Sequence, residues 1–419
     1  MSEPKAPRTS WSRRLGPGLI TGAADDDPSG IATYSQAGAQ FGVNMLWTVV
    51  LSYPLMVSIQ AICARIGRVT GEGLAANMAR VMPRPLVHVI VFLLFVANTV
   101  NIGADIVAMG AAARLMLGWG EALFAVLFAV GSLLLQVFVP YHRYVHVLKW
   151  LTLALFAYVG VLFAVQIDWR AVVLGTVWPQ IPWTQEAFKI IVAVFGTTIS
   201  PYLFFWQAAE EVEDETLAGT SSLLDHPDDA PGELRRIGID TCFGMAFSNL
   251  IAFFILLTTA MTLNKAGITD IGTSAQAAEA LRPIAGDFAF LLFSLGIIGT
   301  GLLALPVLAG SAAYAIAELR GWRIGLEQRP ENARAFYGVI ALAMAMGLFM
   351  LFLPIDPIKA LFWSAVLNGV TAVPLMVATM IVVSSRAHLG GFVASPGLKF
   401  MGWLGTAVMT AAAVAMFAL

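Results

Sequence analysis

Three consecutive carboxylates, Asp25, Asp26 and Asp27, lie in an otherwise apolar stretch and are followed directly by Pro28. A carboxylate at membrane depth costs roughly 2.5–3.5 kcal/mol or more unless it is paired, hydrated or neutralised. Pro28 removes a backbone donor, and Gly30 allows almost any backbone angle. We therefore expect a helix that breaks at the acids and exposes backbone carbonyls beside them. Acids and free carbonyls at mid-membrane are groups that bind a cation.

A second interruption is predicted in the middle of the chain, where Pro201 stands beside Ser200 and near Thr197. Pro28 and Pro201 occupy comparable places in the first spans of two halves that run in opposite directions. Two interrupted helices at matching positions of inverted halves indicate the midplane binding site of a transporter. The alternative is a pair of ordinary proline kinks, which membrane helices tolerate.

The elements that must position these residues are membrane spans. The chain has 419 residues, of which 58% are hydrophobic and 12% charged, and its apolar runs are long enough to cross a bilayer core of about 30 Å. Eleven spans are predicted, at 15–42, 45–64, 86–113, 121–140, 147–166, 187–209, 238–263, 285–316, 335–353, 357–383 and 402–418. The sequence contains no phosphate-binding loop, nucleophile elbow or nucleic-acid signature, so we expect neither an enzyme nor a nucleic-acid partner.

The predicted spans divide into a first five-helix repeat over 15–166, a second over 187–383 and an additional helix over 402–418. Lys and Arg residues gather at the span ends on the side of the basic tail, 1–14, which predicts a cytoplasmic N-terminus in an inner membrane. The polar stretch 210–236 is predicted to be a cytoplasmic loop between the sixth and seventh spans.

The run from Gly16 to Gly30, the break at Pro201 and the span pattern resemble the Nramp family of divalent-metal transporters. The resemblance implies an all-α polytopic membrane protein with a leucine-transporter-like fold. It further implies about eleven transmembrane helices, inverted five-helix repeats and broken helices 1 and 6. The family carries Asp-Pro-Gly-Asn at the first break and Met-Pro-His at the second. It holds metal with the Asp, the Asn, the Met sulfur and backbone carbonyls near the breaks.

Transferred residue by residue, the resemblance implies a metal site made of Asp27, the Ala24 carbonyl, Gly30, the Thr197 carbonyl, Ser200 and Tyr202. Gly30, Ser200 and Tyr202 stand where the family has its asparagine, methionine and histidine. Without the soft thioether the donors are oxygens, which suit Mg²⁺, and the smaller Gly30 and Ser200 should widen the site for a partly hydrated ion. We therefore expect Mg²⁺ as substrate, with Mn²⁺ accepted and no cofactor. This pattern is similar to the Nramp-related magnesium transporter branch.

Proton coupling in the family uses an Asp and a Glu of the third span and the histidine of the sixth. Here Asp105 matches the Asp, Ala108 stands in place of the Glu, and Tyr202 replaces the histidine. A tyrosine titrates near pH 10, too high for a proton relay at neutral pH. We therefore expect weak or no proton coupling. Alternatively, Asp105 is a structural acid satisfied by Asn101 or by a neighbouring span.

Accessory roles are predicted for Asp25 and Asp26, which either attract cations and hold waters of a hydrated ion or pair structurally with another span. Gln207 and Glu210 share a helix face at the inner end of the sixth span. They either line a vestibule that concentrates cations or belong to a solvated helix end. Asn368, in the tenth span, is either an oxygen donor to the occluded ion or part of a helix-packing surface.

The predicted protein imports a divalent ion across the lipid bilayer by alternating access, with no obligate protein partner indicated. One alternative is a proton-coupled Mn²⁺/Fe²⁺ symporter of the Nramp type. A second is an amino-acid or amine carrier on the same fold, although three acids at the break disfavour a substrate carboxylate there. A third is a metal receptor that does not transport.

Overall fold

The computed structural model describes residues 17–419 except 142, 144–147, 149 and 327, and within those residues every regular element is a helix. The predicted N-terminal tail, 1–14, lies outside the described residues. Within the described part, nine helical stretches are long and apolar enough to cross a membrane. One of them, Pro28–Thr70, covers the second half of the first predicted span and the whole of the second, and the fifth predicted span corresponds to a shorter apolar helix, Leu151–Ala164. These stretches account for the eleven predicted spans.

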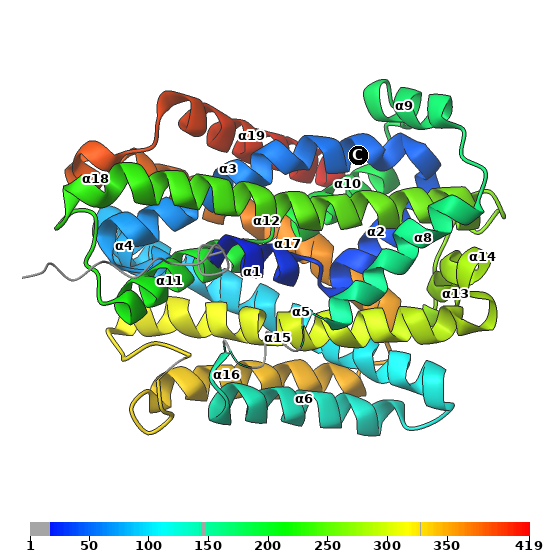
Figure 1. Ribbon diagram of the computed structural model, residues 1–419, viewed down its shortest axis with the longest axis horizontal. Helices are drawn as coiled ribbons and strands as arrows, with labels where there is room; N and C mark the ends of the chain where they lie inside the picture. The colour runs from blue at the N-terminus through cyan, green and yellow to red at the C-terminus, as the bar shows by residue number, and fades with distance from the viewer. Residues whose placement is uncertain (1–16, 142, 144–147, 149, 327) are drawn as a thin grey trace, which may run out of the picture.

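The first and sixth spans are each two helices, and the other spans are continuous or nearly so (Figure 1). In chain order the spans are α1 (Pro17–Asp25) with α2 (Pro28–Phe41), α3 (Leu46–Thr70), α5 (Arg84–Leu117), α6 (Glu121–Phe138), α8 (Phe156–Ala164), α10 (Gln185–Thr198) with α11 (Pro201–Ala218), α12 (Ala230–Thr259), α15 (Ala289–Arg320), α16 (Arg334–Leu348), α17 (Pro357–Ser384) and α19 (Pro396–Ala418). The repeat boundaries drawn from the sequence remain predictions.

Proline alone does not break a helix in this chain. Pro54, Pro306 and Pro374 lie inside α3, α15 and α17, and all three helices continue past them. At the two breaks the residue before the proline is extended instead, with ψ of 169° at Asp27 and 125° at Ser200. Each of these residues can begin a helix whose first position is proline, which is a favourable helix start.

The broken helices lie in the middle of the bundle, and α5, α12 and α15 pass beside them (Figure 1). Helix α1 packs along α12, α10 along α17, and α11 against α3 and α15. Helices α6 and α16 lie together at one edge of the bundle, and α19 packs beside α3 toward the opposite edge (Figure 1). The two breaks are therefore enclosed by long helices rather than exposed to the surroundings.

The stretch expected as a loop over 210–236 is much shorter in the structure. Helix α11 continues to Ala218, and α12 already begins at Ala230. Ion pairs stabilise both helix ends, because Arg68 of α3 contacts Glu215 of α11 and Glu233 of α12. The polar composition of 210–236 predicted a loop. In the structure, the ion pairs of Glu215 and Glu233 with Arg68 stabilise helix at both of its ends.

Short helices that the span pattern did not predict connect several spans. They are α4 (Leu74–Val81), α9 (Trp169–Val177), α13 (Ser274–Ala278), α14 (Arg282–Ala285) and α18 (Arg386–Leu389). Helix α4 is held by Glu318 at the end of α15, whose carboxylate accepts from the backbone of Ala75 at 2.9 Å. Helix α9 stands at one corner of the bundle (Figure 1), away from the breaks.

Candidate metal site

The first break places a single carboxylate at the start of α2. Asp27 caps this helix through Oδ1, which accepts from the Gly30 backbone N–H at 2.8 Å and from the Ser29 hydroxyl at 2.7 Å. Its other oxygen, Oδ2, accepts from Asn101 Nδ2 of α5 at 2.8 Å. The side chain is 1% exposed. The positive end of the α2 dipole and three donors thus stabilise a buried negative charge at the break.

The second break exposes backbone carbonyls at the end of α10. Ser200 occupies the cap position of α11, but its hydroxyl does not bond to that helix. It donates instead to the carbonyls of Thr197 at 2.8 Å and Gly196 at 3.1 Å. The Thr197 carbonyl that was predicted to bind metal is therefore held by Ser200 in this conformation.

The two breaks meet in space, as the sequence predicted. The Tyr202 hydroxyl of α11 donates to the Ala24 carbonyl of α1 at 3.3 Å. A Cβ placed on Gly30 would lie 3.1 Å from Thr197 Oγ1 and 3.5 Å from Asp27 Oδ1. All six residues predicted as metal ligands are buried, and these contacts bring them together across the two breaks.

The site is not widened at Gly30, which corrects one expectation from the sequence. A Cβ on Gly30 would lie only 3.2 Å from Cε2 of Tyr34, so an aromatic ring from the next turn of α2 fills the space that a larger side chain would occupy. Tyr34 was missed because nothing in the sequence distinguishes it from an ordinary buried aromatic residue.

Asp25 and Asp26 face away from Asp27, toward α12. The Ser248 hydroxyl lies 2.5 Å from Asp25 Oδ2 and 3.1 Å from Asp26 Oδ1. Of the two roles considered for these acids, pairing with another span matches these contacts. Asp25 Oδ1 is buried and has no hydrogen-bond partner, so Ser248 satisfies this pair of acids only in part.

Helix α12 also holds the rest of α1. The Gly18 backbone N–H donates to Asp240 Oδ2 at 2.7 Å. This bond caps the N-terminal end of α1. A Cβ on Gly22 would overlap the backbone of Gly244. The contact residues on α12, Asp240, Gly244 and Ser248, are spaced by four and share one helix face. The N-terminal half of the first span is therefore packed against a single helix along its length.

Asp105 does not have the partner that was considered in the sequence. Asn101 bonds to Asp27, not to Asp105, so the proposal that Asn101 satisfies Asp105 is wrong. Both carboxylate oxygens of Asp105 are buried without a hydrogen-bond partner. Asp105 and Asn101 are four residues apart on α5 and so face the same side.

Asn368 is buried in α17, and neither its amide nitrogen nor its amide oxygen has a partner among the described residues. Its neighbour Gly369 packs closely on Val192 of α10. No contact in the described part of the chain joins Asn368 to Asp27. Adjacent residues of a helix point in different directions, so the packing of Gly369 does not place the Asn368 side chain, and the role of Asn368 at the ion stays a prediction.

The C-terminal part of α11 contains an ion-paired cluster. Gln207 Nε2 donates to Glu211 Oε1 at 3.5 Å, and Glu211 Oε2 accepts from Arg236 at 2.5 Å. Glu211 is fully buried and Glu210 partly so. Gln207 thus contacts Glu211 rather than sharing a vestibule with Glu210, and the arginine neutralises the nearest acid. Neither a solvated helix end nor an open anionic vestibule describes this arrangement.

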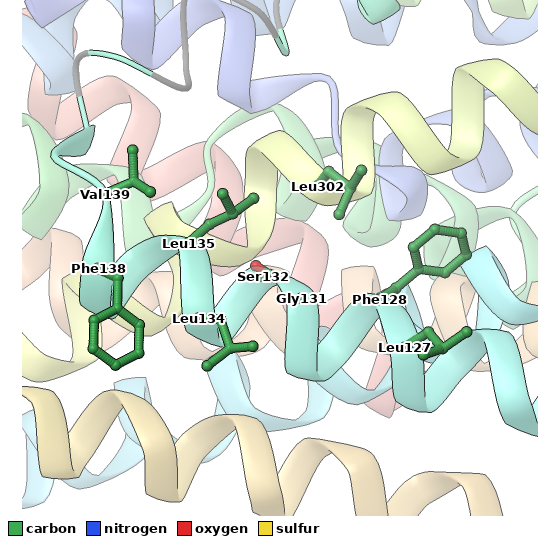
Figure 2. A pocket seen from close by; sticks show the side chains of 9 residues that line it. All are labelled: Leu127, Phe128, Gly131, Ser132, Leu134, Leu135, Phe138, Val139 and Leu302. Atoms are coloured by element: carbon green, nitrogen blue, oxygen red, sulfur yellow. The ribbon is translucent and has the colours of Figure 1, made fainter.

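The site at the breaks is distinct from the large surface groove of about 660 Å³ on α6. Figure 2 shows that groove, with apolar side chains such as Leu127, Phe138 and Leu302 around it. Its lining is almost entirely apolar, and α6 lies at the edge of the bundle. We assign the groove to the hydrocarbon-facing surface, because it offers no donor set for a cation.

Two contacts of the site could have been anticipated in part. Asn101 lies one turn before Asp105, so the sequence already placed both on one face of the third span. Ser29 lies two residues after Asp27, and an Asp side chain commonly bonds to a group at this spacing in a turn. Ser248 could not be predicted from the sequence, because its approach to Asp25 depends on how α12 packs against α1.

Among the described residues, no three His, Cys, Asp or Glu side chains converge on a point that could hold a metal.

Comparison with known proteins decides the family. The sequence model described as natural resistance-associated macrophage protein-like, abbreviated Nramp, matches residues 18–419. The chain belongs to the Nramp family. It is therefore a membrane transporter and not an enzyme, as the two broken helices indicated.

This Nramp protein is similar over nearly its whole length to a curated relative and to a solved structure. The divalent metal cation transporter MntH of Acidiphilium cryptum (strain JF-5) is 26% identical over 418 residues, covering 96% of this chain and 90% of that protein. A crystal structure of the Eremococcus coleocola manganese transporter, bound to an aromatic bis-isothiourea compound, superposes with a TM-score of 0.72 at 17% identity, over 99% of this chain and 88% of the other.

A more distant similarity extends beyond the family. Mhp1, a nucleobase-cation-symport-1 family transporter with bromovinylhydantoin bound, has a TM-score of 0.59 at 12% identity, over 96% of this chain and 92% of its own. Together these structures confirm the predicted leucine-transporter-like fold. They also show that the fold does not specify the cargo, because Mhp1 holds an organic ring. The cargo must be argued from the site.

Proposed function

We propose that this Nramp protein imports divalent cations by alternating access, prefers Mg²⁺, accepts Mn²⁺ and couples weakly or not at all to protons. The observation that carries the proposal is the donor set around Asp27. Its direct contacts are the Ser29 hydroxyl, the Gly30 backbone and the Asn101 amide. The Gly30 N–H and the Asn101 amide nitrogen donate hydrogen bonds to the carboxylate and cannot bind a cation themselves. The proposed ligands are the Asp27 carboxylate, the carbonyls of Ala24 and Thr197 and the Ser200 hydroxyl, all of them hard oxygens, which favour Mg²⁺ over soft ions.

A single carboxylate suits an ion that must be released again. Mg²⁺ is usually held by one or two carboxylates and keeps several of its waters. Asp27 is the one acid that contacts both α2 and α5 at the break, and Asp25 and Asp26 are directed to Ser248. The divalent ion is a substrate in this scheme and no resident cofactor is involved. The bacterial relative supports an inner-membrane location.

Weak proton coupling is proposed from the residues near the breaks. Tyr202 donates its hydroxyl to the Ala24 carbonyl, and Ala108 offers no titratable group. Asp105 is the one relay position with an acid. The membrane potential alone can drive uptake, because a divalent cation gains about 4.6 kcal/mol from 100 mV.

A proton-coupled Mn²⁺ symporter is the second candidate, and two observations favour it. The relatives are named as a divalent metal cation transporter and a manganese transporter. A thioether also lies near the first break, since Met109 Sδ packs against Gly301 beside the Pro28 ring. Asp105, buried and without hydrogen-bond partners, would then carry the proton.

An amino-acid or amine carrier is less compatible with the site. Carriers of zwitterions use the positive start of a broken helix to bind the substrate carboxylate. In this chain Asp27 already caps the start of α2, so a second carboxylate would be repelled. No observation on the described residues favours a receptor that does not transport.

Uptake into proteoliposomes with an internal pH dye separates the two main candidates. We expect Mg²⁺ to enter, excess Mg²⁺ to inhibit Mn²⁺ uptake, and the membrane potential to drive both with little acidification of the lumen. If an about thousandfold excess of Mg²⁺ leaves the rate of Mn²⁺ uptake unchanged, and uptake acidifies the lumen, the protein is instead a proton-coupled symporter.

Ser200→Met should move the ion preference toward soft metals. The substitution places a thioether at the second break and frees the Thr197 carbonyl from the Ser200 hydroxyl. We expect the ratio of Cd²⁺ to Mg²⁺ uptake to rise by about tenfold or more. Ser200→Ala is the matched control, because it removes the hydroxyl without adding sulfur. Equal ratios in the two variants would mean that the residue at this position does not touch the ion.

A further inference from the structure

Asn101 of α5 belongs to none of the ligand positions predicted from the two breaks. Among the described residues, it nevertheless makes the one side-chain hydrogen bond to Asp27 from outside the first span. It is fully buried, and its Nδ2 donates to Asp27 Oδ2 at 2.8 Å. Its Oδ1 is buried and has no hydrogen-bond partner. Leaving such an oxygen unpaired costs about 1–3 kcal/mol, so the amide is held here for a reason other than packing.

The orientation of this amide follows from its partner. An ionised carboxylate only accepts hydrogen bonds, so the nitrogen of Asn101 must be the atom that faces Asp27 Oδ2. The amide oxygen is thereby left as the free group. Rotating the amide by half a turn would not help, because Asn101 Oδ1 would then face Asp27 Oδ2, and both oxygens only accept hydrogen bonds.

The hydrogen bonds of Asp27 show which of its oxygens can bind an ion. Each carboxylate oxygen has about two acceptor positions. Oδ1 uses both, for the Ser29 hydroxyl and the Gly30 N–H, whereas Oδ2 uses one, for Asn101. The open acceptor position on Asp27 therefore lies on Oδ2, directly beside the amide of Asn101.

Helix α5 presents further unpaired oxygens on the same face. Asp105 lies one turn beyond Asn101, and both of its carboxylate oxygens are buried without partners. Asn98, three residues before Asn101, also has a buried oxygen without a partner, but its amide nitrogen donates to the Leu308 carbonyl and the Ser311 hydroxyl of α15, each at 2.8 Å, and not to Asp27. Helix α5 is thus anchored on α15 near Asn98, while the next turn offers free oxygens beside Asp27.

We infer that the Asn101 side-chain oxygen is a ligand of the transported divalent cation, completing the site with Asp27 Oδ2 from a third helix. The inference rests on the proposed function. It makes α5 part of the binding site rather than only a support for it. A hard amide oxygen at this position also adds to the preference for hard ions without adding charge.

The test exchanges one atom at position 101. Asn101→Ser and Asn101→Cys have nearly the same size and differ in oxygen against sulfur, so both leave the same space and lose the same bond to Asp27. If residue 101 touches the ion, Asn101→Cys should bind Cd²⁺ with a cadmium–thiolate absorption band in the ultraviolet. Its Cd²⁺ to Mg²⁺ preference should exceed that of Asn101→Ser by about tenfold.

Two controls complete the experiment. Wild type keeps Cys63 and Cys242 and so gives the thiol background. Thr99→Cys puts a thiol on α5 at a residue whose hydroxyl bonds to its own helix, at the Phe95 carbonyl, and should add no band. The same ion preference in Asn101→Ser and Asn101→Cys, with no new band, would overturn the inference and leave Asn101 as a residue that only orients Asp27.

The result that would contradict the proposed function differs from the result that would contradict the role of Asn101. If wild type takes up neither Mg²⁺ nor Mn²⁺, the substrate assignment is wrong, whatever the variants at position 101 bind. If wild type transports both ions and Asn101→Cys shows no Cd²⁺ band, the function stands and the ligand role of Asn101 is rejected. The optical measurement needs only purified protein in detergent and does not depend on transport.

Discussion

Replacing Asp27 with Ala should lower the initial rate of Mg²⁺ and Mn²⁺ uptake by about a hundredfold or more, equivalent to about 2.8 kcal/mol. Asp27 supplies the charge of the proposed site, and its carboxylate joins the start of α2 to α5. Without it, a dehydrating cation meets only neutral dipoles at membrane depth, where an uncompensated charge is costly. Uptake into proteoliposomes, at matched amounts of reconstituted protein, measures the effect.

The neighbouring acid offers a matched control for that result. Asp27→Asn and Asp26→Asn make the same chemical change at adjacent positions, and both keep a side chain that can hydrogen-bond. Asp26 bonds to Ser248 of α12 rather than facing α5, so Asp26→Asn should retain most of the uptake. Normal transport by Asp27→Asn, or equal losses in the two variants, would remove Asp27 from the centre of the site.

The sequence predicted the breaks well because their causes are local. Asp27 before Pro28 and Ser200 before Pro201 are cap residues followed by a residue suited to the first helical position. Pro54, Pro306 and Pro374 lack this combination and stay within continuous helices. Family resemblance then identified which of these residues meet, and the contact between Tyr202 and Ala24 joins the two breaks.

What the sequence did not predict depends on contacts between distant segments. Gly30 suggested a wider site, but the ring of Tyr34 fills the space beside it. Asn101 was considered as a partner of Asp105, yet it bonds to Asp27. The polar stretch 210–236 was predicted to be a loop, but it contains the end of α11 and the start of α12, where Glu215 and Glu233 pair with Arg68. Each of these outcomes depends on packing between helices that composition and spacing do not encode.

Helix α1, the N-terminal half of the first span, is held along its length by helix α12. Gly18 bonds to Asp240, Gly22 packs on Gly244, and the acids at the end of α1 bond to Ser248. Since these contacts run the whole length of α1, we expect α1 and α12 to move together during alternating access. A defect in this interface should therefore impair the fold and the transport cycle together, rather than change ion preference.

Gly22→Ala tests that expectation with a single methyl group. The new Cβ would overlap the backbone of Gly244. Because a backbone cannot rotate away as a side chain can, α1 must shift. Overpacking of this kind typically lowers the free energy of unfolding by about 1–3 kcal/mol. Gly238→Ala, on α12 with nothing within 4 Å of its new Cβ, should be neutral or slightly stabilising because alanine favours helix. We expect Gly22→Ala to lower the thermal unfolding midpoint in detergent and to reduce uptake by about tenfold or more, which is the effect of about 1.4 kcal/mol. Equal stability and uptake in the two variants would show that α1 does not depend on this contact and is free to move independently of α12.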